Sequence, residues 1–136
     1  MNGKITYINP EGLVKTPAFS QAVMTEGIGR TIYVGGQNAI DVKGNLIGKG
    51  NMGLQVEQVM RNVQTALAAA GATFSDVVKM NIYIVQGQNA NEAFKAAQPF
   101  MKECPHPPAI TGLFVASLAN PEYLIEIEAV AFKSAE

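Results

Sequence analysis

The chain has 136 residues, 48% of them hydrophobic and 15% charged, so one domain over residues 1–136 with a single core is expected and disorder is excluded. Its net charge is −1 and its only arginines are Arg30 and Arg61, so no basic stripe is available to bind a nucleic acid. Because no long apolar run is present and Cys104 is the single cysteine, we expect no membrane partner, no internal disulfide and a cytoplasmic location.

Three strands are predicted in the first third of the chain, where β-branched residues are bounded by turn residues. They cover Lys4–Ile8, Gln21–Glu26 and Thr31–Gly35. The second and third are joined across residues 27–29, a Gly-Ile-Gly sequence that is typical of a hairpin. The adjacent glycines Gly35-Gly36 indicate a bulge or a close backbone approach. A simple strand end and a ligand-facing role fit these glycines equally.

A helix is predicted next, because apolar residues recur at steps of three and four. Its apolar stripe consists of Val56, Val59, Met60, Val63, Ala66, Leu67 and Ala70. Gln55 falls on the polar side of this helix. Asn51 is expected to cap its N-terminus, with a bound anion at that end as the alternative. Gly71 is expected to end it in a left-handed conformation.

The following segment alternates between apolar and mixed residues and predicts a strand over Val77–Val85. One face of this strand is wholly apolar and is expected to pack against a layer of helices. A second helix is predicted over Ala90–Lys102, with Phe94 among the inward-facing residues. Pro99 cannot donate a backbone hydrogen bond, so this helix should kink or break near Gln98.

Two strands are predicted in the C-terminal quarter, at residues 107–115 and 124–132. In the second of these, isoleucines and alanines share one face, because successive side chains of a strand alternate. Glu126 and Glu128 lie together on the other face, about 7 Å apart. Burying unpaired carboxylates is costly, so that face must meet a partner, a ligand or water.

The element order is therefore βββαβαββ. Two helices cannot cover both faces of a six-stranded sheet. We therefore expect an α+β fold in which a six-stranded mixed sheet carries both helices on one face. The other face, with Tyr83, Phe114, Val130 and Phe132, then requires another subunit, which predicts a homo-oligomer.

Four short sequences in this order carry a resemblance to a known family. They are Pro17-Ala18-Phe19-Ser20-Gln21-Ala22, Gly35-Gly36-Gln37, Pro108-Ala109-x-Thr111 and Ile125-Glu126-Ile127-Glu128-Ala129. Together they resemble the signature of the Rid family, the reactive intermediate deaminases, also called YjgF-like. Some members carry the older labels endoribonuclease L-PSP and translation initiation inhibitor. The resemblance runs along the whole chain.

The resemblance implies a chorismate-mutase-like fold and a homotrimer with small-molecule pockets between subunits. In the deaminases the glutamate that matches Glu126 positions a water for attack on an imine carbon, so Glu126 is the implied catalytic residue. Backbone groups near the site correspond to Gly36 and Gly112, and a pocket aromatic residue corresponds to Phe19. The implied ligand-binding residues are Phe19, Gly35, Gly36, Ile110, Thr111 and Gly112.

One position departs from the family. Active imine deaminases carry arginine after Pro-Ala, where its planar fork grips the substrate carboxylate, and this chain has Ile110 there. Three other cations could substitute. Lys79 is expected to form an ion pair with a strand carboxylate in preference to binding substrate. Arg30 at a hairpin tip and His106 in a loop are expected to be solvated.

Other chemistry has weaker support in the sequence. Cys104-x-His106 could be a nucleophile and its base, but no third orienting residue is evident. Spacing suited to metal ligands is absent, and no metal or cofactor is expected. The favoured function is a hydrolase, or deaminase, of imines, enamines or related reactive metabolites that lack a carboxylate. The alternative is a non-catalytic metabolite-binding trimer, and an endoribonuclease is a distant third.

Overall fold

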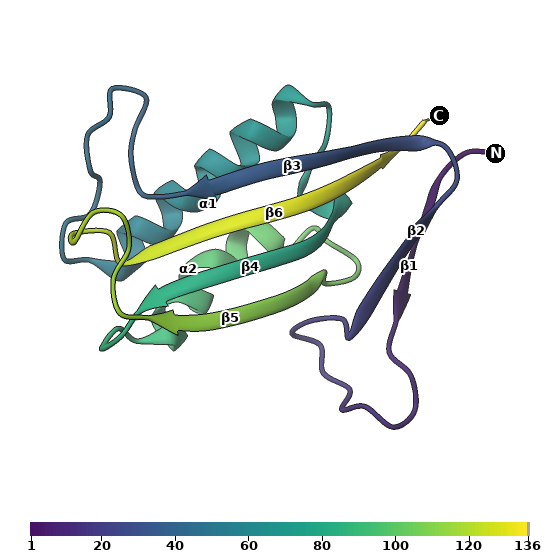
Figure 1. The fold of residues 1–136 in the computed structure, drawn as a ribbon, viewed down its shortest axis with the longest axis horizontal. Helices are drawn as coiled ribbons and strands as arrows, with labels where there is room; N and C mark the ends of the chain where they lie inside the picture. The colour runs from purple at the N-terminus through teal and green to yellow at the C-terminus, as the bar shows by residue number, and fades with distance from the viewer. Residues whose placement is uncertain (136) are drawn as a thin grey trace.

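The computed structural model describes residues 1–135, which form six strands, two α-helices and one short 3-10 helix (Figure 1). The strands at the N-terminal end are β1 (Lys4–Ile8), β2 (Ala22–Glu26) and β3 (Gly29–Gln37). The remaining elements are α1 (Met52–Ala69), η1 (Phe74–Asp76), β4 (Val77–Val85), α2 (Ala90–Met101), β5 (Ala109–Val115) and β6 (Ile125–Ser134). The predicted order of elements is confirmed.

The prediction of a single six-stranded sheet is wrong. The strands form a four-stranded sheet in the order β3-β6-β4-β5 and a separate β1-β2 pair. Strands β4 and β5 are parallel, and the other neighbours are antiparallel. The hairpin expected between β2 and β3 does not form, because the backbone groups of its turn residue Ile28 bond to residues near the N-terminus instead. Ile28 N–H donates to the Met1 carbonyl at 3.0 Å, and Gly3 N–H donates to the Ile28 carbonyl at 2.8 Å.

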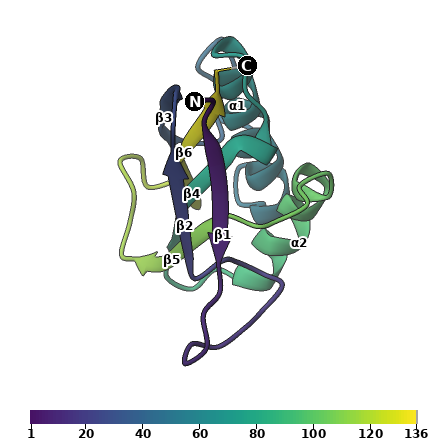
Figure 2. The ribbon, with the colours of Figure 1, turned by 90° about the vertical axis from the view of Figure 1, so that its right-hand side faces the viewer.

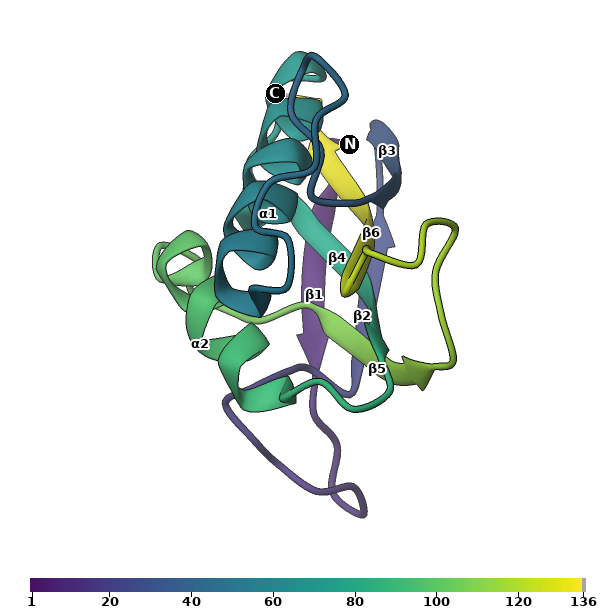
Figure 3. The ribbon, with the colours of Figure 1, turned by 90° about the vertical axis from the view of Figure 1, so that its left-hand side faces the viewer.

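Both helices pack on one face of the four-stranded sheet, as predicted (Figures 2 and 3). The expected stripe of α1 is buried, with Val56, Val59, Met60, Val63 and Leu67 each 0% exposed. The Asn51 side chain accepts a hydrogen bond from Leu54 N–H at 3.0 Å, which confirms this residue as the N-cap of α1. Gly71 follows the helix with φ 76°, the left-handed conformation expected of it.

Three side-chain and helix predictions need correction. Gln55 is fully buried instead of facing water, because its amide ties two distant loops together. It donates to the carbonyls of Gly48 at 3.2 Å and Glu122 at 3.0 Å. Of the kink or break expected near Gln98, the break is not found, and helix α2 continues through Pro99 to Met101. Phe94 does not point into the core and is 48% exposed.

The alternation of β6 is confirmed. Ile125, Ile127, Ala129 and Ala131 are buried under the helices, and Glu126 and Glu128 point to the opposite face, which we call the open face. Phe132 was expected to be uncovered, but Gly3 and Gly29 of the same chain lie against its ring, each with no room for a Cβ. Phe114 pairs in register with Ile84 and so belongs to the helix side. Among residues 1–135, no helix is long and apolar enough to cross a membrane.

Candidate functional site

The open face of the four-stranded sheet gathers the polar side chains of its central strands. In register, Tyr83 of β4 lies opposite Glu126 of β6, and Asn81 lies opposite Glu128. Directly opposed residues of an antiparallel pair share a face, so these four side chains form one cluster. Both glutamates are partly exposed to water. The cluster is therefore a water-accessible carboxylate pair.

A relay of amides holds the Glu126 carboxylate in place. Asn38 Nδ2 donates to Glu126 Oε1 at 3.2 Å and to the Ile125 carbonyl at 3.2 Å. Asn62 Nδ2 in turn donates to the Asn38 carbonyl at 3.0 Å, and Gln58 Nε2 donates to Asn62 Oδ1 at 2.9 Å. Sequence reasoning missed Asn38 and Asn62, because no local pattern links a loop residue to a strand 88 positions away.

Gly35 and Gly36 lie where the register of β3 against β6 shifts, between Val34 and Gln37, which confirms the expected irregularity. The two glycines differ in their surroundings. A Cβ at Gly36 would lie 2.1 Å from Glu126 Oε2, whereas a Cβ at Gly35 would meet nothing within 4 Å. Gly36 is thus the residue whose missing side chain makes room for the Glu126 carboxylate.

The second carboxylate has its own donors. The Tyr83 hydroxyl donates to Glu128 Oε1, and Asn81 Nδ2 approaches the same oxygen at 3.5 Å. This hydrogen bond, followed by desolvation and the nearby charges of both glutamates, raises the pKa of Tyr83 above its ordinary value. Tyr83 therefore keeps its proton at neutral pH. Its hydroxyl is bound to Glu128, and sequence patterns did not reveal this contact.

A cleft of about 500 Å3 opens on the other side of the sheet, between α2 and two proline-containing segments of the chain. Phe19 and Ile110 both line it, together with Met80, Phe94 and Met101. The remaining lining residues are Pro17, Ala18, Met60, Ile82, Ala97, Gln98, Cys104, Pro105, Pro107, Pro108 and Ile127. Its volume lies in the range of small-molecule sites.

The register of β5 explains why Ile110 lies in this cleft. Ile110 pairs with Met80 on the helix side, and Thr111 pairs with Asn81 on the open face. Gly112 follows on the helix side, where a Cβ would meet nothing within 4 Å. Within one chain the predicted site residues thus fall into two groups. Glu126, Gly36 and Thr111 belong to the open face, and Phe19 and Ile110 line the cleft.

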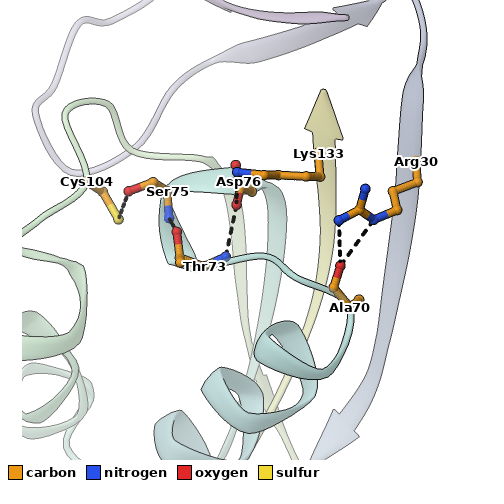
Figure 4. A network of polar contacts seen from close by, with 7 residues as sticks. All are labelled: Arg30, Ala70, Thr73, Ser75, Asp76, Cys104 and Lys133. Carbon is orange, nitrogen blue, oxygen red and sulfur yellow. Dashed lines mark hydrogen bonds and ion pairs between the residues drawn. The ribbon is translucent and has the colours of Figure 1, made fainter. Parts of the chain in front are cut away.

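The candidate replacement cations are engaged in other contacts. Lys79 Nζ donates to Thr111 Oγ1 at 2.6 Å on the open face, so the expected ion pair with a strand carboxylate is not formed. Arg30 donates through Nε and Nη2 to the Ala70 carbonyl at 3.1 and 3.0 Å, where α1 ends (Figure 4). His106 is exposed, as predicted, and its ring lies against Tyr7 with 4.8 Å between centroids.

Cys104 belongs to a polar network around η1 (Figure 4). Ser75 Oγ donates to Cys104 Sγ at 3.9 Å, and Asp76 forms an ion pair of 3.8 Å with Lys133. Burial raises the pKa of the Cys104 thiol, and the Ser75 hydrogen bond offsets part of this effect. A raised pKa leaves little thiolate, so the arrangement does not favour the nucleophile reading of Cys104 and His106. Within residues 1–135, no group of three or more His, Cys, Asp or Glu side chains could hold a metal ion.

Comparison with known proteins gives consistent matches along the chain. The family model described as Endoribonuclease L-PSP matches residues 12–133. A RutC family protein of Pyrococcus horikoshii is 32% identical over 115 residues, or 85% of this chain and 86% of its own. The 2-iminobutanoate/2-iminopropanoate deaminase of Homo sapiens is 31% identical over 115 residues, or 85% and 80% of the two chains. The crystal structure of YyfB, a Rid family protein of unknown function from Yersinia pestis, matches with TM-score 0.83 and 39% identity, covering 93% of this chain and 97% of that one.

Proposed function

The chain belongs to the Rid (YjgF-like) family, and from this premise we propose that it hydrolyses imines or enamines that carry no carboxylate. The family includes relatives named 2-iminobutanoate/2-iminopropanoate deaminase, so imine hydrolysis is the chemistry to test first. The substrate class differs from theirs in our proposal, because Ile110 stands where the Rid pattern implies arginine.

In the proposed reaction Glu126 is the general base. It accepts a proton from a water molecule as the oxygen adds to the imine carbon, and the proton passes to the nitrogen to give a carbinolamine. The hydroxyl proton then moves to the nitrogen, the carbon–nitrogen bond breaks, and a carbonyl compound and ammonia leave. The Asn38 hydrogen bond, at 3.2 Å, and the room left at Gly36 favour one position of the base.

The observation that carries the proposed substrate class is the charge of the open face. Among residues 1–135, neither Glu126 nor Glu128 forms an ion pair with a lysine or arginine. A substrate carboxylate beside Glu126 would meet like charges, and Lys79, a cation on the same face, donates to Thr111 Oγ1 at 2.6 Å and forms no ion pair with either glutamate. Like charges in a partly desolvated site repel, and a carboxylate buried beside Ile110 would lack its usual bidentate partner. A neutral or protonated imine meets no such penalty.

We propose further that the two groups of site residues meet between neighbouring subunits of a homotrimer, as the Rid resemblance implies. One chain carries Glu126 on the open face, and Ile110 lines a cleft on the other side of the sheet, so one small ligand in one chain cannot reach both. Exposed apolar side chains on the open face, Tyr33 at 79% and Leu113 at 50%, favour a protein neighbour. Light scattering should give three times 14.5 kDa, and a stable monomer at micromolar concentration would contradict the trimer.

The hydrolase is tested by ammonia release from imines made in situ. An amine oxidase supplies imines without a carboxylate, and an amino-acid oxidase supplies imino acids. We expect the wild type to accelerate hydrolysis of the first kind and to act on the second at least about tenfold more slowly, since a charged hydrogen bond is worth about 1.5–3 kcal/mol.

Two variants sharpen this test. Glu126→Gln keeps the size of the side chain and should abolish the acceleration, and Glu92→Gln, an exposed glutamate of α2, serves as the matched control. Equal turnover of both substrate kinds by the wild type would refute the effect assigned to Ile110. Ligand binding without any turnover dependent on Glu126 would favour the alternative, a non-catalytic binding protein.

A further inference from the structure

We propose that the cleft lined by Phe19, Phe94 and Ile110 holds a hydrocarbon substituent of the substrate, an inference that rests on the function proposed above. The proposed substrates are then only some of the imines that lack a carboxylate. They are imines derived from amines that carry an aliphatic or aromatic group. The apolar group lies inside the cleft of one chain, and the reacting carbon lies outside it, beside Glu126 of a neighbouring subunit in the trimer proposed above.

The lining of the cleft is apolar almost throughout. Of the residues around it, only Gln98 has a hydrogen-bonding amide, and Cys104 contributes a thiol. No Asp, Glu, Lys or Arg is among its lining residues, as far as the described residues show. A charged or strongly polar group entering this space would lose its hydration without gaining a partner. A hydrocarbon group has no favourable hydration to lose, and the removal of its apolar surface from water lowers the free energy.

The cleft borders the hydrophobic core. Its lining includes Met60, Met80 and Ile127, which are 0%, 3% and 1% exposed and belong to the core under the helices. A group held in the cleft therefore has apolar side chains behind it instead of water. With Met101, three methionines line the space, and their flexible side chains adapt to groups of different shape.

The exposure of Phe94 also favours an apolar ligand. Phe94 lies on α2 and lines the cleft, and the residue is 48% exposed, whereas the apolar periodicity of the helix predicts an inward-facing side chain. A bound hydrocarbon group would cover this ring. Phe19 and Ile110, both partly buried, lie around the same space, so aromatic and aliphatic surfaces surround the ligand.

The occupant is a small molecule in preference to a protein segment, because residues of one chain line the cleft from several sides. Helix α2, the strand β5 and the proline-containing segments 17–19 and 104–108 all contribute to its walls. Prolines restrict the backbone, which preserves the space in the absence of a ligand. Its volume of about 500 Å3 suits a small molecule.

Binding is measured with the full chain in its natural assembly, using the uncharged fluorophore N-phenyl-1-naphthylamine displaced by a series of straight-chain 2-ketones. Ketones are analogues of the carbonyl product. We expect the affinity to rise about fourfold for each added methylene until the cleft is filled. A 2-keto acid of equal length should bind at least about tenfold more weakly.

Variants identify the cleft as the binding place. Phe94→Ser and Ile110→Asn should each weaken binding of the longer ketones about tenfold or more, since each removes apolar contact area. Val42→Ser, at a loop residue that is 101% exposed, is the matched control and should leave the affinity unchanged.

Several outcomes would overturn the inference. These are affinities independent of chain length, equal losses in Phe94→Ser and Val42→Ser, or exclusion of fluorophore and ketones because another copy of the chain fills the cleft. Failure of the proposed function would look different. The ketone series would still depend on chain length and on Phe94, but ammonia release would not depend on Glu126.

Discussion

Replacing Gly36 by alanine tests the placement of the proposed base through a single methyl group. The added Cβ would lie 2.1 Å from Glu126 Oε2 and 2.8 Å from the carboxyl carbon. Both are far below van der Waals contact, so the carboxylate has to retreat by about 1 Å or more. The clash involves the end of a flexible side chain and no backbone atom. We therefore expect the fold to survive and the carboxylate to leave its position beside Asn38.

The expected effect on catalysis follows from that displacement. A misplacement of about 1 Å in a catalytic group costs on the order of a hundredfold in rate, which corresponds to about 2.7 kcal/mol in the activation free energy. Ammonia release from amine-derived imines should fall by about this factor in Gly36→Ala. The midpoint of thermal unfolding should move little, because a Gly to Ala change at an ordinary backbone conformation alters stability by less than about 1 kcal/mol.

Gly35→Ala is the matched control, since a Cβ at this neighbouring residue meets nothing within 4 Å. It introduces the same methyl group into the same bulge and should retain the wild-type rate. Gly36→Ala with a rate within threefold of wild type and an unchanged unfolding midpoint would show that Glu126 is not the base. Equal losses in both variants would assign the effect to the bulge itself.

Three further predictions concern stability, thiol chemistry and RNA. Gln55→Ala should lower the free energy of unfolding in urea by about 2–4 kcal/mol, because it empties a fully buried position and removes the hydrogen bonds to Gly48, Glu122 and Leu124, whereas Gln64→Ala, at an exposed position, should change it by less than about 0.5 kcal/mol. Cys104 should react with iodoacetamide more slowly than a peptide cysteine at pH 8 and faster as the pH rises, and Ser75→Ala should slow it further because the Ser75 hydrogen bond lowers the thiol pKa. RNA should stay intact with the purified protein, and cleavage that disappears in Glu126→Gln would contradict this.

Local periodicity accounts for the parts of the fold that the sequence predicted well. The alternation in β6 places Glu126 and Glu128 on one face because side chains of a strand have a period of two, whatever lies around them. The stripe of α1 from Val56 to Leu67 is likewise a property of the helix itself. Asn51 and Gly71 act on the backbone within a few residues. Each of these features depends on neighbours in the chain, so the sequence alone contains the information.

Features that depend on distant residues were not predictable in this way. The hairpin expected across residues 27–29 does not form, because the Ile28 backbone is hydrogen-bonded to Met1 and Gly3. The helical pattern predicts that Gln55 faces water, because the two loops that its amide joins lie far from it in the sequence. The contact between Asn38 and Glu126 spans 88 positions. The face on which Ile110 lies follows from its pairing with Met80, which motif comparison does not supply.

The position of Ile110 changes how the departure from the Rid pattern is understood. On sequence grounds alone, isoleucine in place of arginine removes one hydrogen-bond donor from an otherwise unchanged site. In the structure Ile110 lies in a cleft with Met80, Phe94 and Met101, where a guanidinium would find no carboxylate of the same chain among the lining residues. An arginine there would need an anion to offset its desolvation. Ile110 therefore matches the apolar side chains around it. The change Ile110→Arg alone would place a positive charge among apolar groups.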